Sequence, residues 1–171
     1  KEDYIAMLDW SLTQNEYPVA IKVPGGSMIS TGVPVTKDFS KLDTYEITKK
    51  GSRVAILGLG TFYETAVKAA NILKTSHGID ATVINPYYIS GIDADTLNEL
   101  KKDHAVVATL EDGYLEGGFG AKIAAYYGSS DMKVLNFGIK KEFIDRYDAS
   151  EVLKYNHLTP EQIAEDIAAT L

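Results

Sequence analysis

Cysteine is absent from this 171-residue chain, and no apolar run is long enough to cross a membrane as a helix. The protein therefore forms neither disulfides nor thiolate metal sites, which fits a cytoplasmic location. A membrane helix needs roughly 18 consecutive apolar residues, so we expect no membrane partner. Lys and Arg number 17 against 24 Asp and Glu, a net charge of −7. Nucleic acid binding needs clustered cations, so we expect no nucleic acid partner.

Histidine is also scarce, and the common catalytic motifs are missing. His77, His104 and His157 are far apart and lack the H-x-x-H or H-E-x-x-H spacing of metal sites. Neither a G-x-S-x-G nucleophile elbow nor a Walker A loop occurs. Composition is that of an ordinary globular protein, with 45% hydrophobic and 24% charged residues. The residues themselves thus predict a folded, acidic protein with no catalytic residue, cofactor site or metal site in this chain.

The first 43 residues differ in pattern from the rest. Residues 2–14 predict a helix with one apolar face, formed by Ile5, Leu8 and Leu12. "PVAIKV" (18–23) predicts a short buried strand. Residues 25–43 are rich in Gly, Pro, Ser and Thr without periodicity, which is typical of a linker. Because the chain starts directly in a helical pattern, we expect it to begin partway through a domain.

Beyond residue 43, aliphatic runs alternate with helical stretches. Strands are predicted at 53–58, 81–85, 105–111 and 133–138, with a possible edge strand at 44–48. Helices are predicted at 61–76, 93–102, 117–128 and 159–170. The strand runs do not alternate strictly, as is usual where both faces of a parallel sheet are buried. This order predicts an α/β fold of three layers, a mostly parallel sheet with helices on both faces.

The last helix carries its own start signal and apolar stripe. Thr159 is the expected N-cap, Pro160 the first helical residue, and Gln162 completes a capping box. Ile163, Ile167 and Leu171 are the expected stripe facing the core.

The turn "GLGTFY" (58–63) is one residue short of a dinucleotide-binding fingerprint. Gly58 and Gly60 occupy two of three glycine positions, but Tyr63 occupies the third, where a ring is expected to hold helix and strand apart. Thr61 and Glu64 form a T-x-x-E capping box, which would engage the N–H groups a phosphate needs. A tight turn with a capped helix is thus favoured over an NAD site, which stays an alternative.

A second glycine-rich turn, "LEDGYLEGGFGAKI" (110–123), contains three carboxylates within six positions. Glu111, Asp112 and Glu116 suggest a phosphate cradle, a hard-metal site or an acid/base pair. Like charge disfavours phosphate, and the spacing is not that of a calcium loop. An acid/base pair would need a pocket that raises the pKa of one carboxyl. The structural interpretation is that the glycines let the helix approach another backbone closely, with the acids solvated or capping the helix.

Taken in order, these motifs resemble the C-terminal third of the transketolase family, most of all its 1-deoxy-D-xylulose-5-phosphate synthase members. "PVAIKVPGG" (18–26) resembles that group's "PxAIRYPRG", and "VVATLEDGYLEGGFGAKI" (106–123) its "VVTVEExxxxGGFGSAV". "GSRVAILGLGTFYETAVKAANIL", "ATVINPYYISGIDADTLNEL", "VLNFGIKKEFID" and "LTPEQIAEDI" resemble the remaining segments in the same order. The resemblance implies three segments: 1–24 as the tail end of the pyrimidine-binding domain, 25–43 as a linker and 44–171 as the transketolase C-terminal domain.

The resemblance also implies what the longer enzyme does and what this part contributes. Such enzymes hold thiamine diphosphate and Mg²⁺ in upstream domains, through a G-D-G…N motif and a glutamate that this sequence lacks. The implied reaction decarboxylates pyruvate and joins the two-carbon unit to glyceraldehyde 3-phosphate. This part is expected to be inactive alone and to serve contacts with the upstream domains and within a homodimer. Its implied interface loop is the E…GG-x-G motif, here Glu111, Gly117, Gly118 and Gly120.

Two departures from the family pattern concern the substrate. Lys22 and Gly25 are the substrate-proximal positions by resemblance, but Gly25 stands where the family has an arginine. Tyr87 likewise replaces the arginine after "NP", and glycine or tyrosine cannot bind phosphate as a guanidinium does. The alternatives are a transketolase-like paralogue, a 2-oxo-acid dehydrogenase beta subunit, and a stand-alone interaction module or NAD-binding domain.

NAD separates the NAD-binding-domain alternative from the others. If the turn at Gly58 bound the dinucleotide, NAD would stabilise the folded chain and raise its melting temperature. We expect no shift of the melting temperature with saturating NAD in a thermal unfolding experiment. A concentration-dependent rise would contradict the capped-helix interpretation.

Overall fold

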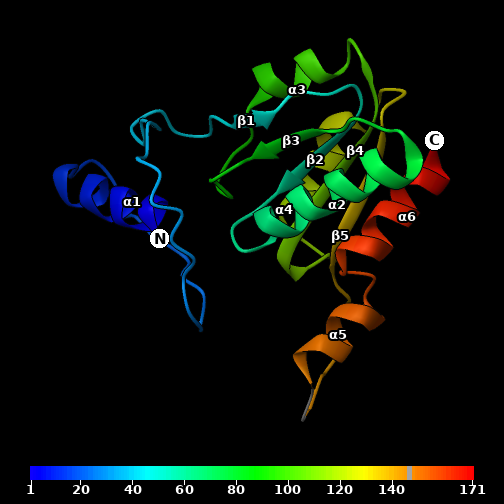
Figure 1. Cartoon of the computed structure of the whole chain (residues 1–171). Helices are drawn as coiled ribbons and strands as arrows, with labels where there is room; N and C mark the ends of the chain where they lie inside the picture. The colour runs from blue at the N-terminus through cyan, green and yellow to red at the C-terminus, as the bar shows by residue number, and fades with distance from the viewer. Residues whose placement is uncertain (146–147) are drawn as a thin grey trace. The chain divides into compact units, whose positions relative to one another are not determined.

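The computed structural model describes residues 1–145 and 148–171 and divides the chain into two compact units, Lys1–Leu42 and Asp43–Leu171. We call them unit 1 and unit 2 and describe each by itself (Figure 1). In unit 1, helix α1 (Glu2–Thr13) confirms the predicted first helix. The strand predicted at 18–23 is wrong, since these residues are irregular and mostly exposed. A strand needs a neighbour to pair its backbone, and residues 1–42 contain no other strand.

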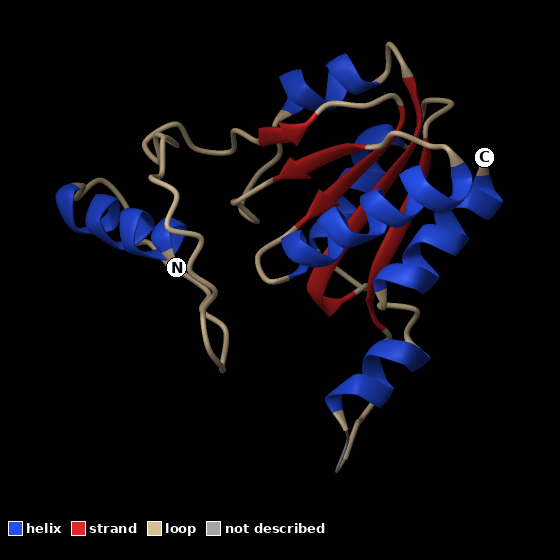
Figure 2. Cartoon of the chain, in the orientation of Figure 1, coloured by secondary structure: helices blue, strands red, loops and turns tan. Residues whose placement is uncertain are grey.

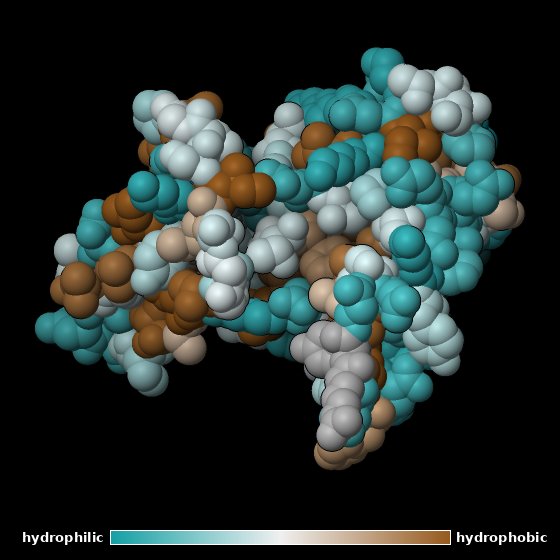
Figure 3. Space-filling view, turned by 60° about the horizontal axis from the view of Figure 1, so that its bottom comes forward, coloured by the Kyte–Doolittle hydropathy of each residue, from teal (hydrophilic) through white to brown (hydrophobic). Residues whose placement is uncertain are grey.

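Unit 1 has almost no interior. Of its apolar side chains only Phe39 is buried, and α1 has no buried residue. Ile5 and Leu12 of the predicted apolar face are 45% and 78% exposed. Brown apolar side chains accordingly reach the surface of unit 1 in the space-filling view (Figure 3). The amphipathic pattern of α1 is thus present, but nothing within unit 1 covers it.

Unit 2 is built on one five-stranded sheet with the order β1-β3-β2-β4-β5. The strands are β1 (Glu46–Lys49), β2 (Arg53–Gly58), β3 (Thr82–Asn85), β4 (His104–Tyr114) and β5 (Lys133–Ile139). Strands β2 to β5 run parallel, and β1 pairs antiparallel with β3 at the edge. All four predicted strands and the predicted edge strand are confirmed, with small differences at their ends.

Helices cover both faces of this sheet (Figure 2). On one face α2 (Phe62–His77) packs against α6 (Pro160–Thr170), and their apolar side chains share a core cluster with Val54, Ile56 and Val106. On the other face α3 (Ala94–Leu100) and α4 (Phe119–Tyr127) pack over a second cluster. The predicted three-layer α/β architecture is therefore confirmed.

The structure contains one helix that was not predicted. The N-terminal capping of the helix after it, α6, agrees with the expectation only in part. Helix α5 (Ala149–Tyr155) precedes α6. Thr159 accepts a hydrogen bond from the Gln162 N–H at 3.3 Å, as an N-cap does. The Gln162 side chain does not reach back to close a capping box but donates to the Lys154 carbonyl at 3.0 Å. The glutamine thus links the start of α6 to the end of α5, at a carbonyl that also accepts the His157 N–H at 3.2 Å.

The predicted stripe of α6 holds for two of its three residues. Ile163 and Ile167 are fully buried, whereas Leu171 is 40% exposed. Leu171 follows the last helical residue, so it is not held on the face that the helix presents to the core.

Two buried tyrosines on the α3/α4 face differ in one interaction. The Tyr127 hydroxyl donates to the Leu97 carbonyl at 2.7 Å. The Tyr45 hydroxyl is buried without a hydrogen-bond partner among the described residues, and the Tyr45 ring packs edge-on against Phe119. Burial raises the pKa of both phenols above its ordinary value.

The two hydroxyl groups should therefore differ in their contribution to stability. We expect Tyr127→Phe to lower the free energy of unfolding by about 1–2 kcal/mol, because the Leu97 carbonyl loses its donor. Tyr45→Phe should be neutral or stabilising, by up to about 1 kcal/mol, because it removes an unpaired buried polar group. Urea unfolding of the two variants measures both values. An equal loss in the two variants would contradict this difference.

Candidate functional site

The first glycine-rich turn joins β2 to α2 at the carboxyl end of the sheet. Gly60 has a φ of +60°, which glycine adopts without strain. At Gly58 a Cβ would lie 2.7 Å from the Tyr63 Cα, so the helix approaches the strand closely at this point. Tyr63 therefore does not hold the two elements apart, contrary to the sequence-based expectation. Its side chain packs at the edge of the core instead.

The capping box predicted for α2 is also wrong. Thr61 has helical backbone angles and its side chain makes no capping hydrogen bond. The first N–H groups bond to backbone carbonyls, from Phe62 to Leu59 at 3.2 Å and from Tyr63 to Gly60 at 3.1 Å. Since the tight turn supplies these acceptors itself, Thr61 is not needed as a cap.

The second glycine-rich turn is built around the Glu111 carboxylate. Glu111 lies near the end of β4 and is only 5% exposed. Its two oxygens accept hydrogen bonds from the Phe119 and Gly120 N–H groups, each at 2.8 Å. These N–H groups belong to the first turn of α4, where the helix itself provides no acceptor. The buried acid is thus a side-chain cap of α4, as the structural interpretation of this turn expected.

The other two acids of this turn point to different surroundings. Asp112 is exposed, and Glu116 is exposed and forms an ion pair with Lys141 at 3.2 Å. Throughout the described residues, no group of three His, Asp or Glu side chains is arranged to hold a metal ion. Glu111, Asp112 and Glu116 therefore do not converge as a set of metal ligands.

Two glycines make room for the capping carboxylate and for a buried polar pair. A Cβ at Gly118 would lie 2.5 and 2.6 Å from the Glu111 carboxylate oxygens. A Cβ at Gly120 would lie 2.5 Å from Thr109 Oγ1 and 2.7 Å from Asn136 Oδ1. Thr109 donates to Asn136 at 2.8 Å beneath the start of α4. Sequence reasoning missed this pair, although each residue is a polar interruption in an apolar strand.

The loop after β3 contains Tyr87, one of the two departures from the family pattern. Tyr87 has a φ of +59°, unusual for a residue with a side chain. Its hydroxyl donates to Glu46 Oε2 on β1 at 2.5 Å. Lys122 of α4 donates to the carbonyls of Ile89 and Ser90 in the same loop. The Tyr87 hydroxyl thus ties its loop to the edge strand.

The remaining predicted residues are not brought together. Lys22 and Gly25 lie on exposed, irregular backbone of unit 1, and a Cβ at Gly25 would meet no atom within 4 Å. The three histidines have separate partners: Glu165 at 3.6 Å for His77, Thr82 at 2.8 Å for His104 and Asp166 at 2.9 Å for His157.

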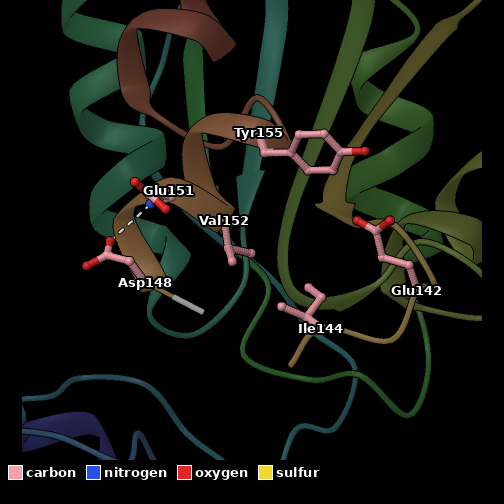
Figure 4. A pocket seen from close by; sticks show the side chains of 6 residues that line it. All are labelled: Glu142, Ile144, Asp148, Glu151, Val152 and Tyr155. Carbon is pink, nitrogen blue, oxygen red and sulfur yellow. Dashed lines mark hydrogen bonds between the residues drawn. The ribbon is translucent and has the colours of Figure 1, made fainter. Parts of the chain in front are cut away.

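A shallow hollow lined by α5 and by residues of the chain between β5 and α5 contains several acids (Figure 4). Its lining is Glu142, Ile144, Asp148, Glu151, Val152 and Tyr155. Hydrogen bonds from the Ser150 side chain and the Glu151 and Ser150 N–H groups hold the pKa of Asp148 below its ordinary value. Asp148 is therefore committed to capping α5, where it accepts from the first-turn N–H groups.

The order of strands and the glycine turns can be compared with known proteins. A family model described as the C-terminal domain of transketolase matches residues 43–163, most of the chain. This chain belongs to the transketolase C-terminal domain family. The match covers almost all of unit 2, including both glycine-rich turns and the Glu111 cap.

Curated relatives of this transketolase domain extend the similarity to unit 1. A 1-deoxy-D-xylulose-5-phosphate synthase from Clostridium acetobutylicum is 34% identical over 169 residues, 97% of this chain and 27% of the relative. The synthase from Clostridium tetani is 32% identical over 97% of this chain and 26% of the relative. The chain thus spans about a quarter of the length of these relatives.

Solved structures agree on the fold. A structure described as a split gene transketolase, inactive beta4 tetramer, has a TM-score of 0.70 at 23% identity, covering 85% of this chain and 47% of that chain. A transketolase from Pichia stipitis has a TM-score of 0.51 at 22% identity, covering 75% of this chain and 18% of that chain. No helix in the described part of the chain is long and apolar enough to span a membrane.

The close contacts at the α4 start make its glycines sensitive to substitution. We expect Gly120→Ala to lower the free energy of unfolding by about 1–3 kcal/mol, because the added methyl displaces the Thr109–Asn136 pair. Gly128→Ala at the other end of α4 should be nearly neutral, since its Cβ would lie 3.4 Å from the nearest atom and its φ is −55°. Urea unfolding of both variants tests this. Equal losses would show that tight packing at residue 120 is not the cause.

Proposed function

We propose that the chain is the C-terminal part of a thiamine-diphosphate-dependent transferase that acts as a 1-deoxy-D-xylulose-5-phosphate synthase. The reaction would combine pyruvate with glyceraldehyde 3-phosphate and release CO₂. One observation carries the proposal: the similarity to curated synthases covers 97% of the chain and so includes unit 1 as well as the family domain. The curated relatives that match over this whole length are named as synthases.

We assign residues 1–24 to the end of a pyrimidine-binding domain, 25–43 to a linker and 44–171 to the C-terminal domain. The exposure of Ile5, Leu8 and Leu12 supports the first assignment. Burying such side chains gains about 1.5–3 kcal/mol each, so a helix with this face needs a covering domain. In this proposal, further polypeptide of the same enzyme supplies that cover.

The cofactor would be held outside this chain. The described residues offer no cluster of acids or histidines for Mg²⁺, and Glu111 is already engaged by two backbone N–H groups. These residues do not fit thiamine diphosphate with Mg²⁺, so no catalytic step is assigned to them. The chain alone would then have no turnover.

The partners would be the upstream domains and a second copy of the enzyme in a cytoplasmic homodimer. The loop that carries Glu111, Gly117, Gly118 and Gly120 is the proposed contact region. The similarly folded split gene transketolase is described as an inactive beta4 tetramer, which supports self-association without activity for a chain of this kind.

A transketolase-like paralogue with another acceptor aldehyde is the second candidate. Gly25 favours it, because glycine supplies no cation for a substrate phosphate. Tyr87 does not decide between the two, because its hydroxyl is bound to Glu46 and contributes to the loop structure.

A chimaeric enzyme tests the activity and the acceptor together. The final quarter of the Clostridium acetobutylicum synthase is replaced by this chain, and CO₂ release from pyruvate is measured with glyceraldehyde 3-phosphate or glyceraldehyde. We expect activity with the phosphorylated aldehyde, and none for the isolated chain or for the synthase truncated before this part. A preference for glyceraldehyde would favour the paralogue. Tight binding of thiamine diphosphate to the isolated chain in calorimetry would contradict the proposal.

The Gly25→Arg variant of the chimaera is the matched test of the phosphate position. An added guanidinium beside a substrate phosphate should lower the KM for glyceraldehyde 3-phosphate roughly tenfold, about 1.4 kcal/mol of binding, and leave the KM for glyceraldehyde unchanged. An equal change for both aldehydes would place residue 25 away from the phosphate.

A further inference from the structure

The carboxyl ends of β2 and β4 form the point of the sheet where open α/β folds commonly bind ligands. The chain after β2 passes through α2 to β3 on one side, and the chain after β4 passes through α4 to β5 on the other. Ligands of open α/β sheets usually bind where connections diverge in this way, often with an anion at a helix N-terminus.

In unit 2 the chain itself fills the space at the carboxyl ends of β2 and β4. The Leu59 N–H donates to the Leu110 carbonyl at 2.9 Å and joins the two turns. Beside it, the Glu111 carboxylate accepts from the Phe119 and Gly120 N–H groups, each at 2.8 Å. An external anion would use the same two donors, so it would have to compete with a carboxylate attached to the chain.

The glycines around Glu111 fit the carboxylate closely. A Cβ at Gly118 would come within 2.6 Å of both carboxylate oxygens, and Gly117 adopts a φ of +73° just before. Glu111 is 5% exposed, which excludes bulk water from most of its surface. The helix start, the two donors and the space without side chains together form a complete carboxylate site with its ligand in place.

We propose that Glu111 is a built-in ligand that occupies the anion site of this domain. It prevents phosphates, nucleotides and carboxylates from binding at the carboxyl ends of β2 and β4. It also fixes the loop 112–118 to the start of α4. A small carboxylate is the class of ligand that the site would accept once the Glu111 side chain is shortened. Glu111 is thus a positioning residue for the loop, and this role does not depend on the chemistry of the longer enzyme.

Chemical rescue tests the assignment. Glu111→Ala removes a group equivalent to acetate, so acetate can re-enter the vacated site and bond to both N–H groups. In sodium chloride we expect the melting temperature of the full chain to fall by roughly 6–12 °C. Replacing the chloride with about 0.2 M sodium acetate should raise the melting temperature of the variant by at least about 2 °C more than that of the unchanged protein.

Glu116→Ala is the matched control. It removes a carboxylate from the same loop, but one that is exposed and pairs with Lys141 instead of a helix start. Acetate should give this variant no extra stabilisation over the unchanged protein. If acetate stabilises all three proteins equally, or if Glu111→Ala melts like the unchanged protein, the assignment is wrong.

Glu111→Gln covers the case in which the alanine variant does not fold. Glutamine keeps the length of the side chain but offers only one oxygen, so it can satisfy only one of the two N–H groups. Hydrogen exchange of the Phe119 or Gly120 amide should then become at least about tenfold faster than in the unchanged protein. Unchanged exchange at both amides would overturn the proposal.

Discussion

The Glu111 carboxylate is hydrogen-bonded to the first turn of α4. The structure at the carboxyl ends of the parallel strands in unit 2 depends on this contact. The Phe119 and Gly120 N–H groups, which the helix itself leaves unpaired, both donate to this one buried acid. With the start of α4 in place, Phe119, Ile123 and Tyr127 fill the core on that face of the sheet. Lys122, one turn further along, then holds the loop after β3 through two carbonyls. One acid near the end of a strand thus fixes the start of α4 and, through Lys122, supports the loop after β3.

The two units differ in how many of their apolar side chains they bury. Unit 2 buries continuous apolar clusters on both faces of its sheet, whereas unit 1 buries only Phe39 among its apolar side chains. Unit 2 has the packing of a domain, while α1 presents apolar side chains that other polypeptide would have to cover. This difference agrees with a chain that spans about a quarter of its curated relatives.

Strands β2 to β5 of unit 2 were predictable because each is an apolar run bounded by turn residues, which is typical of strands covered on both faces of a parallel sheet. The run at 18–23 has the same appearance but no partner strand in unit 1, so it stays irregular. Thr61 and Glu64 match a capping box, yet the preceding turn already supplies backbone acceptors. Local patterns failed where a competing contact, or the lack of a partner, decided the conformation.

The sequence by itself determined the α/β class, the order of the elements and the resemblance to the transketolase family. It also limited the acidic turn to a few interpretations. Only the tertiary structure decided between them, by bringing Glu111 to N–H groups eight and nine residues away. It also brought Thr109 of β4 to Asn136 on the neighbouring strand β5. The periodicity of a sequence reports which face of an element is buried. The partner of a buried polar group depends on how separate elements meet, and no local pattern contains that information.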